Sequence, residues 1–197
     1  MEDRSRKGAG VEVRCEQVGT SLYQQLLNDA FDALPAQVQA LHRPTAPQRW
    51  AGVAEVRRGR GVLARLVAAL FGFPKAGVNV PVSVTFTAER GGERWTRDFA
   101  GRRFSSWQRR GSGRDDCLLV ERFGPIDVSL ALLQQGDRLL LVPRRWAVLG
   151  IRLPNALLPQ GSTFETEVDG HFVFNVEIAA PLVGLIVAYR GTLLPSM

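Results

Sequence analysis

The feature that most constrains this chain is a series of short segments with alternating apolar and polar residues, joined by tight turns. The clearest segment runs from Val78 to Thr87, where Val and finally Phe occupy every second position. A period of two is typical of a strand with one buried face. Asp169-Gly170, between two further segments, is a strong signal for a hairpin turn. Short turns join antiparallel neighbours, because parallel strands need long crossovers.

Nine segments carry this signal and are predicted to be strands. They cover residues 50–58, 78–87, 95–99, 118–123, 126–133, 138–142, 164–168, 172–178 and 184–193. An antiparallel sheet of this many strands tends to curl or close, which protects its edges. We therefore expect an α+β fold that is mostly antiparallel β, built as a strongly curved sheet or β-barrel. The short connections argue against a doubly wound α/β fold.

Helical spacing of apolar residues is confined to three places. Residues 20–34 and 35–42 predict two N-terminal helices, opened by a Ser cap and by Pro. Residues 62–71 predict one helix inserted between strands. Residues 1–19 mix charges, Gly and Ser without a period, and are expected to form a disordered leader. Residues 20–197 are expected to form a single β-rich domain.

Composition and cysteine usage indicate an ordinary globular protein of the cytoplasm. Of the 197 residues, 45% are hydrophobic and 22% are charged. The longest apolar run, residues 178–188, is shorter than the roughly 20 residues that a membrane-spanning helix needs. Residues 1–10 lack the apolar core of a secretory signal. Cys15 and Cys117 cannot form a disulfide framework.

Positive charge is concentrated in the first part of the chain. The formal net charge is +6, and residues 43–114 hold 15 basic and 4 acidic residues. Within residues 102–114, five Arg side chains surround Trp107. Such a pattern can hold phosphates and stack bases, which makes a surface for nucleic acid or anionic lipid one alternative. A solvated sheet face followed by a charged loop explains it as well.

The sequence contains none of the common catalytic or metal-binding motifs. It has no Walker loop, HExxH, CxxC or GxSxG, and His42 and His171 are its only histidines. We therefore expect no metal and no cofactor, and expect surface or capping roles for both histidines. Residues 59–64 match G-x-G-x-x-A, but no acidic residue for a ribose lies between Glu55 and Glu89. A turn followed by a helix explains these glycines.

Polar residues inside apolar strands are the candidates for a ligand site. Along residues 172–178, Val173, Asn175 and Glu177 oppose a wholly apolar face. If the polar set points into a barrel, it can anchor the head group of a ligand. If it points outward, it is solvated and its ion pairs contribute little. The candidate ligand-binding residues are Arg97, Glu121, Arg145, Asn175, Glu177 and Tyr189.

Seven blocks of the sequence resemble a bacterial family called domain of unknown function 4166. The blocks are LYQQLLNDAFDALPAQVQALHRP, RWAGVAEVRRGRGVLARLVAALFGFPKAG, VPVSVTFT, ERWTRDFAGRRFSS, LLVERFGP, RRWAVLGIRLPNALLP and PLVGLIVAYRGTLLP. The resemblance covers about residues 20–195. Proteins of this kind occur alone and as C-terminal partners of saccharopine-dehydrogenase-like, NAD(P)-binding domains. The resemblance thus implies a link to small-molecule metabolism, and it carries over no catalytic residue.

Three functional hypotheses follow. The leading one is a non-catalytic module that binds an apolar or amphipathic small molecule in the curved sheet or barrel. The second is a catalytic or accessory domain that works with a dehydrogenase-like partner, with Glu121 or Glu177 beside an Arg in a pocket. The third is that the basic surface of residues 102–114 binds nucleic acid or anionic lipid. A shift of one residue in strand register exchanges the core face and the solvent face of a strand. Which face of each strand points into the barrel therefore decides among the three hypotheses.

Overall fold

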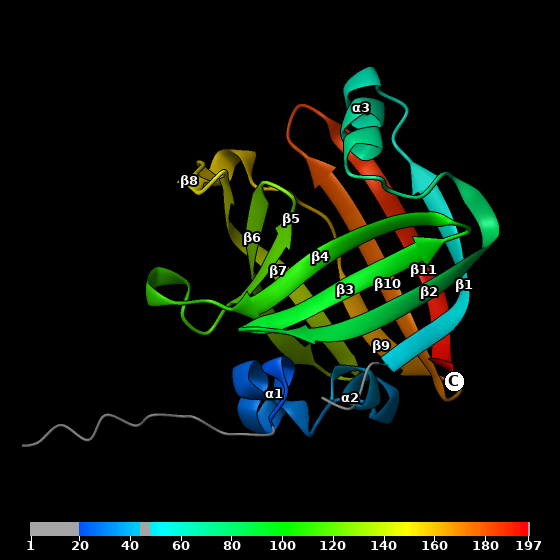
Figure 1. The fold of residues 1–197 in the computed structure, drawn as a ribbon, viewed down its shortest axis with the longest axis vertical. Helices are drawn as coiled ribbons and strands as arrows, with labels where there is room; N and C mark the ends of the chain where they lie inside the picture. Colours follow the sequence, from blue (N-terminus) through cyan, green and yellow to red (C-terminus); the bar gives the residue numbers. More distant parts are fainter. Residues whose placement is uncertain (1–19, 44–47, 197) are drawn as a thin grey trace, which may run out of the picture.

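The predicted strands close into an antiparallel barrel. The computed structural model describes residues 20–43 and 48–196. The strands are β1 (Gln48–Arg58), β2 (Gly77–Glu89), β3 (Gly92–Phe99), β4 (Arg102–Arg110), β5 (Leu119–Phe123), β6 (Ile126–Gln135), β7 (Arg138–Val148), β8 (Ile151–Arg152), β9 (Phe164–Val168), β10 (His171–Ala180) and β11 (Gly184–Ser196). They follow the order β6-β5-β4-β3-β2-β1-β11-β10-β9-β7, and pairing of β6 with β7 closes the ring of ten (Figure 1). The two-residue β8 pairs with β7 outside the ring.

Local irregularities bend the barrel wall. The register shifts between Ala54 and Val56 in β1, between Ser129 and Leu130 in β6, and after Ile178 in β10. Such bulges increase the bend and twist of a strand, which closure of a sheet requires. The irregularity between β6 and β7 inserts one extra residue, Arg144, into β7, because Pro143 lies opposite Leu130 and Arg145 lies opposite Ser129. It therefore decides which residues of β7 face the interior.

Strand β4 was not among the nine predicted strands. Its Phe104, Ser106 and Gln108 are buried, whereas Ser105 is exposed and Trp107 only half-buried. The period of two is therefore present, but two of the inward residues are polar and the flanks are rich in Arg. Hydrophobicity alone hides such a strand, and this is why residues 102–114 were interpreted partly as a loop.

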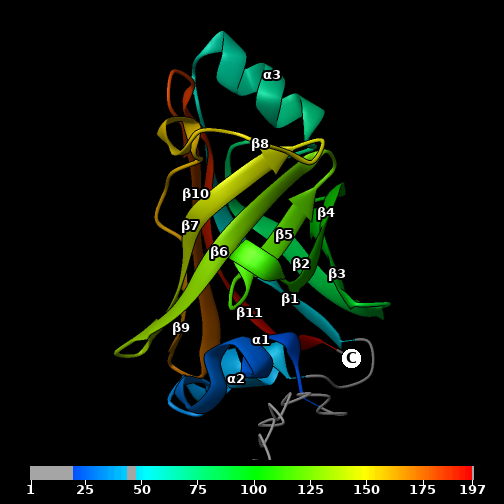
Figure 2. The same cartoon turned by 90° about the vertical axis from the view of Figure 1, so that its left-hand side faces the viewer.

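Two short helices close one end of the barrel, which we call the plug end (Figures 1 and 2). Helix α1 (Leu22–Leu27) starts in a capping box between Ser21 and Gln24, and a 3₁₀ turn, η1 (Asn28–Phe31), follows. Helix α2 (Ala36–His42) begins after Pro35. The buried side chains that these elements send toward the strands are Tyr23, Leu27, Phe31, Val38, Leu41 and His42.

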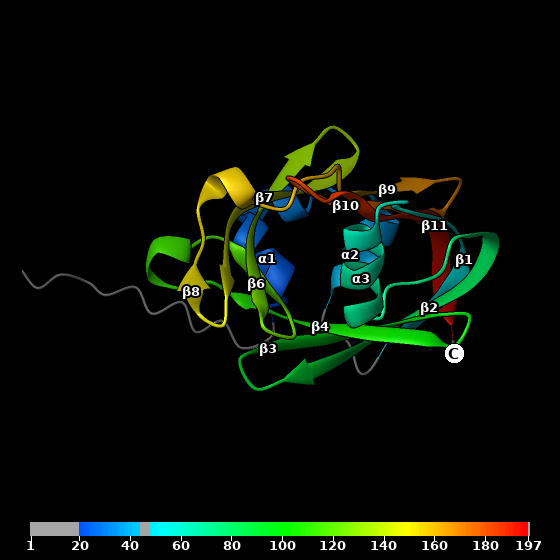
Figure 3. The same cartoon turned by 90° about the horizontal axis from the view of Figure 1, so that it is seen from above.

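The inserted helix α3 (Val62–Leu70) lies at the opposite end, which we call the α3 end (Figures 2 and 3). It buries Ala64 and Ala68. The chain then returns to β2 through a segment held by Arg58, whose guanidinium donates to the carbonyls of Phe73 and Pro74 at 2.9 and 2.6 Å.

The fold class is as predicted, and one expectation lies outside the structure. The predicted leader, residues 1–19, falls outside the described residues. Within the described part, no helix has both the length and the apolar character to cross a membrane.

Candidate functional site

The barrel encloses a cavity of about 180 Å³ that runs from the plug end toward the α3 end. Tyr23 borders it at the plug end, and Val67 and Phe71 border it at the α3 end. Its apolar wall comes from β6, β7, β10 and β11. That wall contains Val128, Leu130, Leu141, Pro143, Val176 and Ile178. The cavity also borders the exposed residues Gln160 and Gly161, so it reaches the surface beside them.

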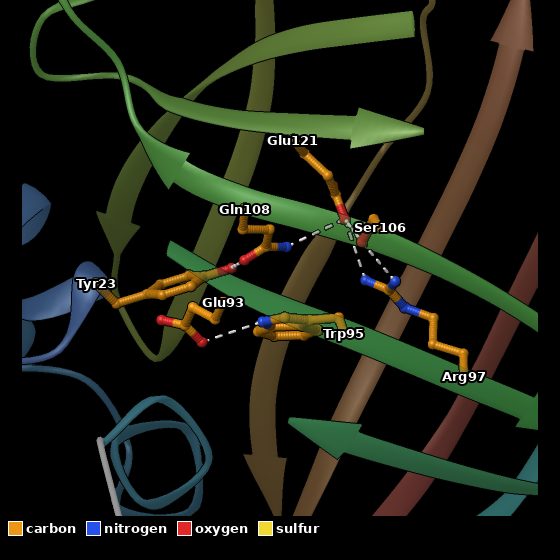
Figure 4. A network of polar contacts seen from close by, with 7 residues as sticks. All are labelled: Tyr23, Glu93, Trp95, Arg97, Ser106, Gln108 and Glu121. Carbon is orange, nitrogen blue, oxygen red and sulfur yellow. Dashed lines mark hydrogen bonds and ion pairs between the residues drawn. The ribbon is translucent and has the colours of Figure 1, made fainter. Parts of the chain in front are cut away.

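A chain of polar contacts crosses the facing wall, which β3, β4 and β5 form (Figure 4). Glu121 Oε1 accepts hydrogen bonds from Ser106 Oγ at 2.6 Å, Gln108 Nε2 at 3.1 Å and Arg97 Nη2 at 3.2 Å. Arg97 Nη1 also donates to Ser106 Oγ at 2.9 Å. Gln108 Oε1 accepts from the hydroxyl of Tyr23 at 3.1 Å, which links the plug to the wall. These side chains meet because alternate residues of neighbouring strands share one face.

The contacts of Glu121 leave one carboxylate oxygen available. All of its hydrogen bonds within the described residues end on Oε1. Oε2 accepts none of these hydrogen bonds, and it is not among the fully buried polar atoms without a partner. The carboxylate is nevertheless buried and borders the cavity. Glu121 therefore presents a charged acceptor to whatever occupies the cavity.

Both tyrosines of the chain border the cavity. Burial raises the pKa of Tyr189 to about 12, with Arg97 opposing and Glu121 adding to that effect. Burial, together with Glu165 and Glu121, holds the pKa of Tyr23 well above its usual value. Both phenols thus remain protonated hydrogen-bond donors at neutral pH. Tyr23 uses its hydroxyl in the wall, and Tyr189 makes no side-chain hydrogen bond within the described residues.

A second buried cluster lies where the plug meets the barrel. The rings of Tyr23 and His42 are stacked with their centroids 3.6 Å apart. His42 Nε2 lies 2.5 Å from Glu165 Oε2. Glu93 accepts from the indole of Trp95 at 3.2 Å, and burial raises the pKa of Glu93 while His42 and Trp95 lower it. The expectation of a surface or capping role for His42 was wrong, since its ring is buried in the core.

The structure brings three of the six predicted site residues together, and a fourth, Glu177, borders the same cavity. Arg97, Glu121 and Tyr189 all border the cavity. Arg145 lies on the outside, next to the bulge in β7, and donates to Asp115 at 2.9 Å.

Asn175 and Glu177, the two predicted site residues of β10, lie on the face of this strand opposite its apolar face. Asn175 donates to the carbonyl of Ser162. Glu177 borders the cavity beside Gly161, but alternation turns its side chain away from the face of Val176. The apolar face of this strand therefore points inward, and the polar face is the outer one.

Sequence reasoning missed the other half of the site. Tyr23 was assigned only to the apolar face of a helix, and Ser106 and Gln108 lie on the strand that was not recognised. Glu165 was placed on a strand but not considered for the site. The signal that could have found Ser106 and Gln108 is their spacing from Phe104, which continues the alternation through the Arg-rich segment.

Three of the five arginines of residues 102–114 have local partners, whereas Nε of Arg102 is buried without a hydrogen-bond partner among the described residues. Arg103 pairs with Asp98 at 2.7 Å, and Arg110 pairs with Asp116 at 3.1 Å. Arg109 lies over the ring of Trp107. Part of the positive charge of this segment, that of Arg103 and Arg110, is therefore compensated by neighbouring aspartates. In the described part of the chain, no three His, Cys, Asp or Glu side chains are placed to hold a metal ion.

Comparison with known proteins identifies a family. No curated protein and no solved structure matched the chain. A family model described as a domain of unknown function (DUF4166) matches residues 34–193. The match includes α2 and nearly all of the barrel, whereas Tyr23 lies outside it. Because the match spans most of the sequence, the chain belongs to the family of domain of unknown function 4166.

Proposed function

We propose that the barrel binds a small amphipathic molecule, with its polar end at Glu121 and its apolar part against β6, β7 and β10. The observation that carries this proposal is the division of one cavity into a polar and an apolar wall. Ligand pockets commonly combine apolar walls with a few convergent polar groups, which fix orientation.

The size of the cavity limits what it can enclose. Its volume of about 180 Å³ is below the roughly 300–1,000 Å³ of pockets for drug-sized ligands. It is somewhat larger than the engineered cavity of about 150 Å³ that holds benzene. The enclosed part of the ligand is therefore a single ring or a short alkyl chain, and a longer ligand would extend past Gln160 to the surface.

The charges around the cavity select the chemistry of the polar end. Glu121 and Glu165 both border the cavity, and Glu121 keeps one acceptor oxygen open. The cation of Arg97 is already engaged, since Nη1 and Nη2 donate to Ser106 and Glu121. An incoming anion would meet two carboxylates in a poorly solvated site, where like charges repel strongly. A hydroxyl or an ammonium group, which donates hydrogen bonds, suits this site better than a carboxylate or a phosphate.

Three probes of equal chain length test this preference directly. We expect 1-octanol and octylamine to raise the melting temperature of the protein and to give saturable heat in calorimetry, and octanoate to do so far more weakly. Native mass spectrometry of the protein as purified would then identify a resident molecule. The proposal is wrong if none of the three probes binds, or if octanoate binds as tightly as octylamine.

Two variants with one control locate the binding in the cavity. Val128→Phe fills the cavity from β6 and should abolish binding of all three probes. Leu133→Phe adds similar bulk on the same strand, where the side chain is exposed, and should leave binding unchanged. Glu121→Gln removes the charge at nearly constant shape and should weaken octylamine binding more than octanol binding. Equal binding by Val128→Phe and the wild type would place the probes elsewhere and overturn the proposal.

A further inference from the structure

Helix α3 has an unusual distribution of side chains. Helices of globular proteins normally turn their large apolar residues to the core. In α3 the buried residues are Ala64 and Ala68, whereas Leu66 and Leu70 are 62% and 80% exposed. Leu63 is exposed as well. Core packing of the barrel therefore does not account for the leucines of this helix.

Two turns place further large apolar residues at the same end of the barrel (Figures 1 and 2). Leu149 lies in the turn between β7 and β8, Ile151 follows that turn, and both are exposed. Leu182, in the turn between β10 and β11, is 95% exposed. Single exposed apolar residues are ordinary, but a group of them at one end marks an interaction site. We call this group the apolar rim, and it consists of Leu63, Leu66, Leu70, Leu149, Ile151 and Leu182.

Positive charge predominates around the apolar rim, and it is concentrated at α3, whereas Asp115 pairs with Arg152 beside Ile151. The segments that contribute the rim residues, residues 56–88, 138–164 and 178–197, contain no Asp or Glu. Arg60, Arg65 and Lys75, in or next to α3, are exposed and form no ion pair within the described residues. The arginines of the barrel wall differ, because residues such as Arg103 and Arg122 pair with neighbouring aspartates.

We propose that the α3 end of the barrel docks on an anionic lipid surface. Apolar side chains that enter the lipid interface beside Arg and Lys, which face acidic headgroups, are the usual means by which a helix lies on a membrane. A second copy of the chain suits this end poorly, because a two-fold contact would bring Arg60 and Arg65 against the same cations. A nucleic acid would contact the cations but leave the leucines exposed to water.

Docking at this end would bring the cavity close to the lipid surface. Val67 and Phe71 border the cavity, while their neighbours Leu66 and Leu70 point outward. Helix α3 thus lies between the cavity and the proposed membrane contact. The docking itself does not depend on a ligand, so it can be tested separately from ligand binding.

Vesicle flotation with the full chain tests the proposal. We expect binding to vesicles of phosphatidylcholine mixed with phosphatidylglycerol, much weaker binding to phosphatidylcholine alone, and a decrease with added salt. Leu66→Glu/Leu70→Glu should abolish binding. The matched control, Val53→Glu/Leu133→Glu, changes two exposed apolar residues of the barrel strands and should retain it. Each of Arg60→Gln and Arg65→Gln should weaken binding about fivefold, which corresponds to about 1 kcal/mol per charge near the surface.

The outcomes separate this proposal from its rivals. Equal loss in the control variant, or equal binding to neutral and anionic vesicles, would overturn it. So would the absence of vesicle binding together with a dimer in analytical ultracentrifugation that Leu66→Glu/Leu70→Glu dissociates, because the occupant would then be a second copy. Val128→Phe, which fills the cavity, should bind vesicles like the wild type, and this distinguishes a failure of docking from a failure of ligand binding.

Discussion

His42 Nε2 lies 2.5 Å from Glu165 Oε2, and this contact joins the last residue of α2 to the barrel strand β9. Two residues along the same strand, Glu167 accepts a hydrogen bond from the backbone N–H of Gln37 at 2.8 Å, near the start of the helix. Residues two apart in a strand point to the same face. One face of β9 therefore holds both ends of a seven-residue helix that would be unstable alone.

Breaking the contact between His42 and Glu165 should destabilise the fold strongly. His42→Ala or Glu165→Ala leaves a buried polar partner without its hydrogen bond, which typically costs about 1–3 kcal/mol and more for a charged partner. The double variant His42→Leu/Glu165→Leu should lose less than the sum of the two single changes. Urea unfolding followed by tryptophan fluorescence measures these free energies.

Glu167→Ala serves as the comparison for this pair. It removes a hydrogen bond to a helix N-terminus that is only partly buried, and we expect a loss of about 1 kcal/mol. A loss for Glu165→Ala no greater than that for Glu167→Ala would show that the buried contact does not hold the plug.

Gly59 and Gly61 differ in the space that each has for a side chain. An added Cβ at Gly59 would lie 1.7 Å from the carbonyl oxygen of Leu185 and 2.9 Å from Cβ of Ala64. Gly61 has space, with its nearest neighbour at 3.9 Å. Gly59→Ala should therefore destabilise the protein by several kcal/mol and disturb the packing of α3 on β11, whereas Gly61→Ala should change stability by about 1 kcal/mol or less.

Thermal unfolding of the two alanine variants checks this difference. Similar melting temperatures for Gly59→Ala and Gly61→Ala would show that the close approach of Leu185 is not needed for folding. The comparison also bears on the G-x-G-x-x-A motif. In this fold Gly59 allows two backbone segments to approach, which is a packing role and requires no nucleotide.

The barrel could be predicted from sequence because its strands show the period of two in the simplest way. Val78 to Thr87 is one example, and the hairpin at Asp169-Gly170 is another. The site was harder to predict, because its residues interrupt that pattern. Ser106 and Gln108 occupy inward positions that a hydrophobicity pattern assigns to apolar residues, and Tyr23 comes from a helix about 70 residues earlier in the chain than Trp95, to which it lies close.

The direction of strand faces could not be deduced in advance. Nothing local to β10 shows whether the face of Phe174 or that of Asn175 points inward; closure of the ring decides it, together with the pairing of both neighbours. A role beside a dehydrogenase-like partner stays a prediction, since it concerns a protein other than this chain.

Ser106 should contribute more to the stability of the fold than its neighbour Ser105. Its hydroxyl is buried, donates to Glu121 at 2.6 Å and accepts from Arg97 at 2.9 Å. Ser106→Ala removes one hydrogen bond to each of two charged groups, and we expect a loss of about 2 kcal/mol in the free energy of unfolding. Ser105 is exposed on the outer face of β4, and Ser105→Ala should change stability by less than about 0.5 kcal/mol. Equal effects in chemical unfolding would contradict the polar wall.

The two tyrosines give a test of burial at high pH. Tyr23 and Tyr189 are the only tyrosines, and burial raises the pKa of both, that of Tyr189 to about 12. The phenolate absorbance of the folded protein should therefore show no group that titrates near pH 10. In strong denaturant both phenols should titrate near the ordinary value of about 10. A folded-state titration near pH 10 would mean that one phenol is open to water.

The same shift predicts how stability depends on pH. Between about pH 10 and 12 the unfolded chain loses the proton of Tyr189 while the folded chain keeps it, so the unfolded state binds fewer protons and stability falls as pH rises. This stability is fully present below about pH 10, and about 2 kcal/mol of it is lost by pH 12 for a shift of about two pKa units. Tyr189→Phe cannot lose this proton. Its free energy of unfolding, measured in urea at increasing pH, should fall less steeply than that of the wild type, and parallel curves would show that Tyr189 does not titrate with unfolding.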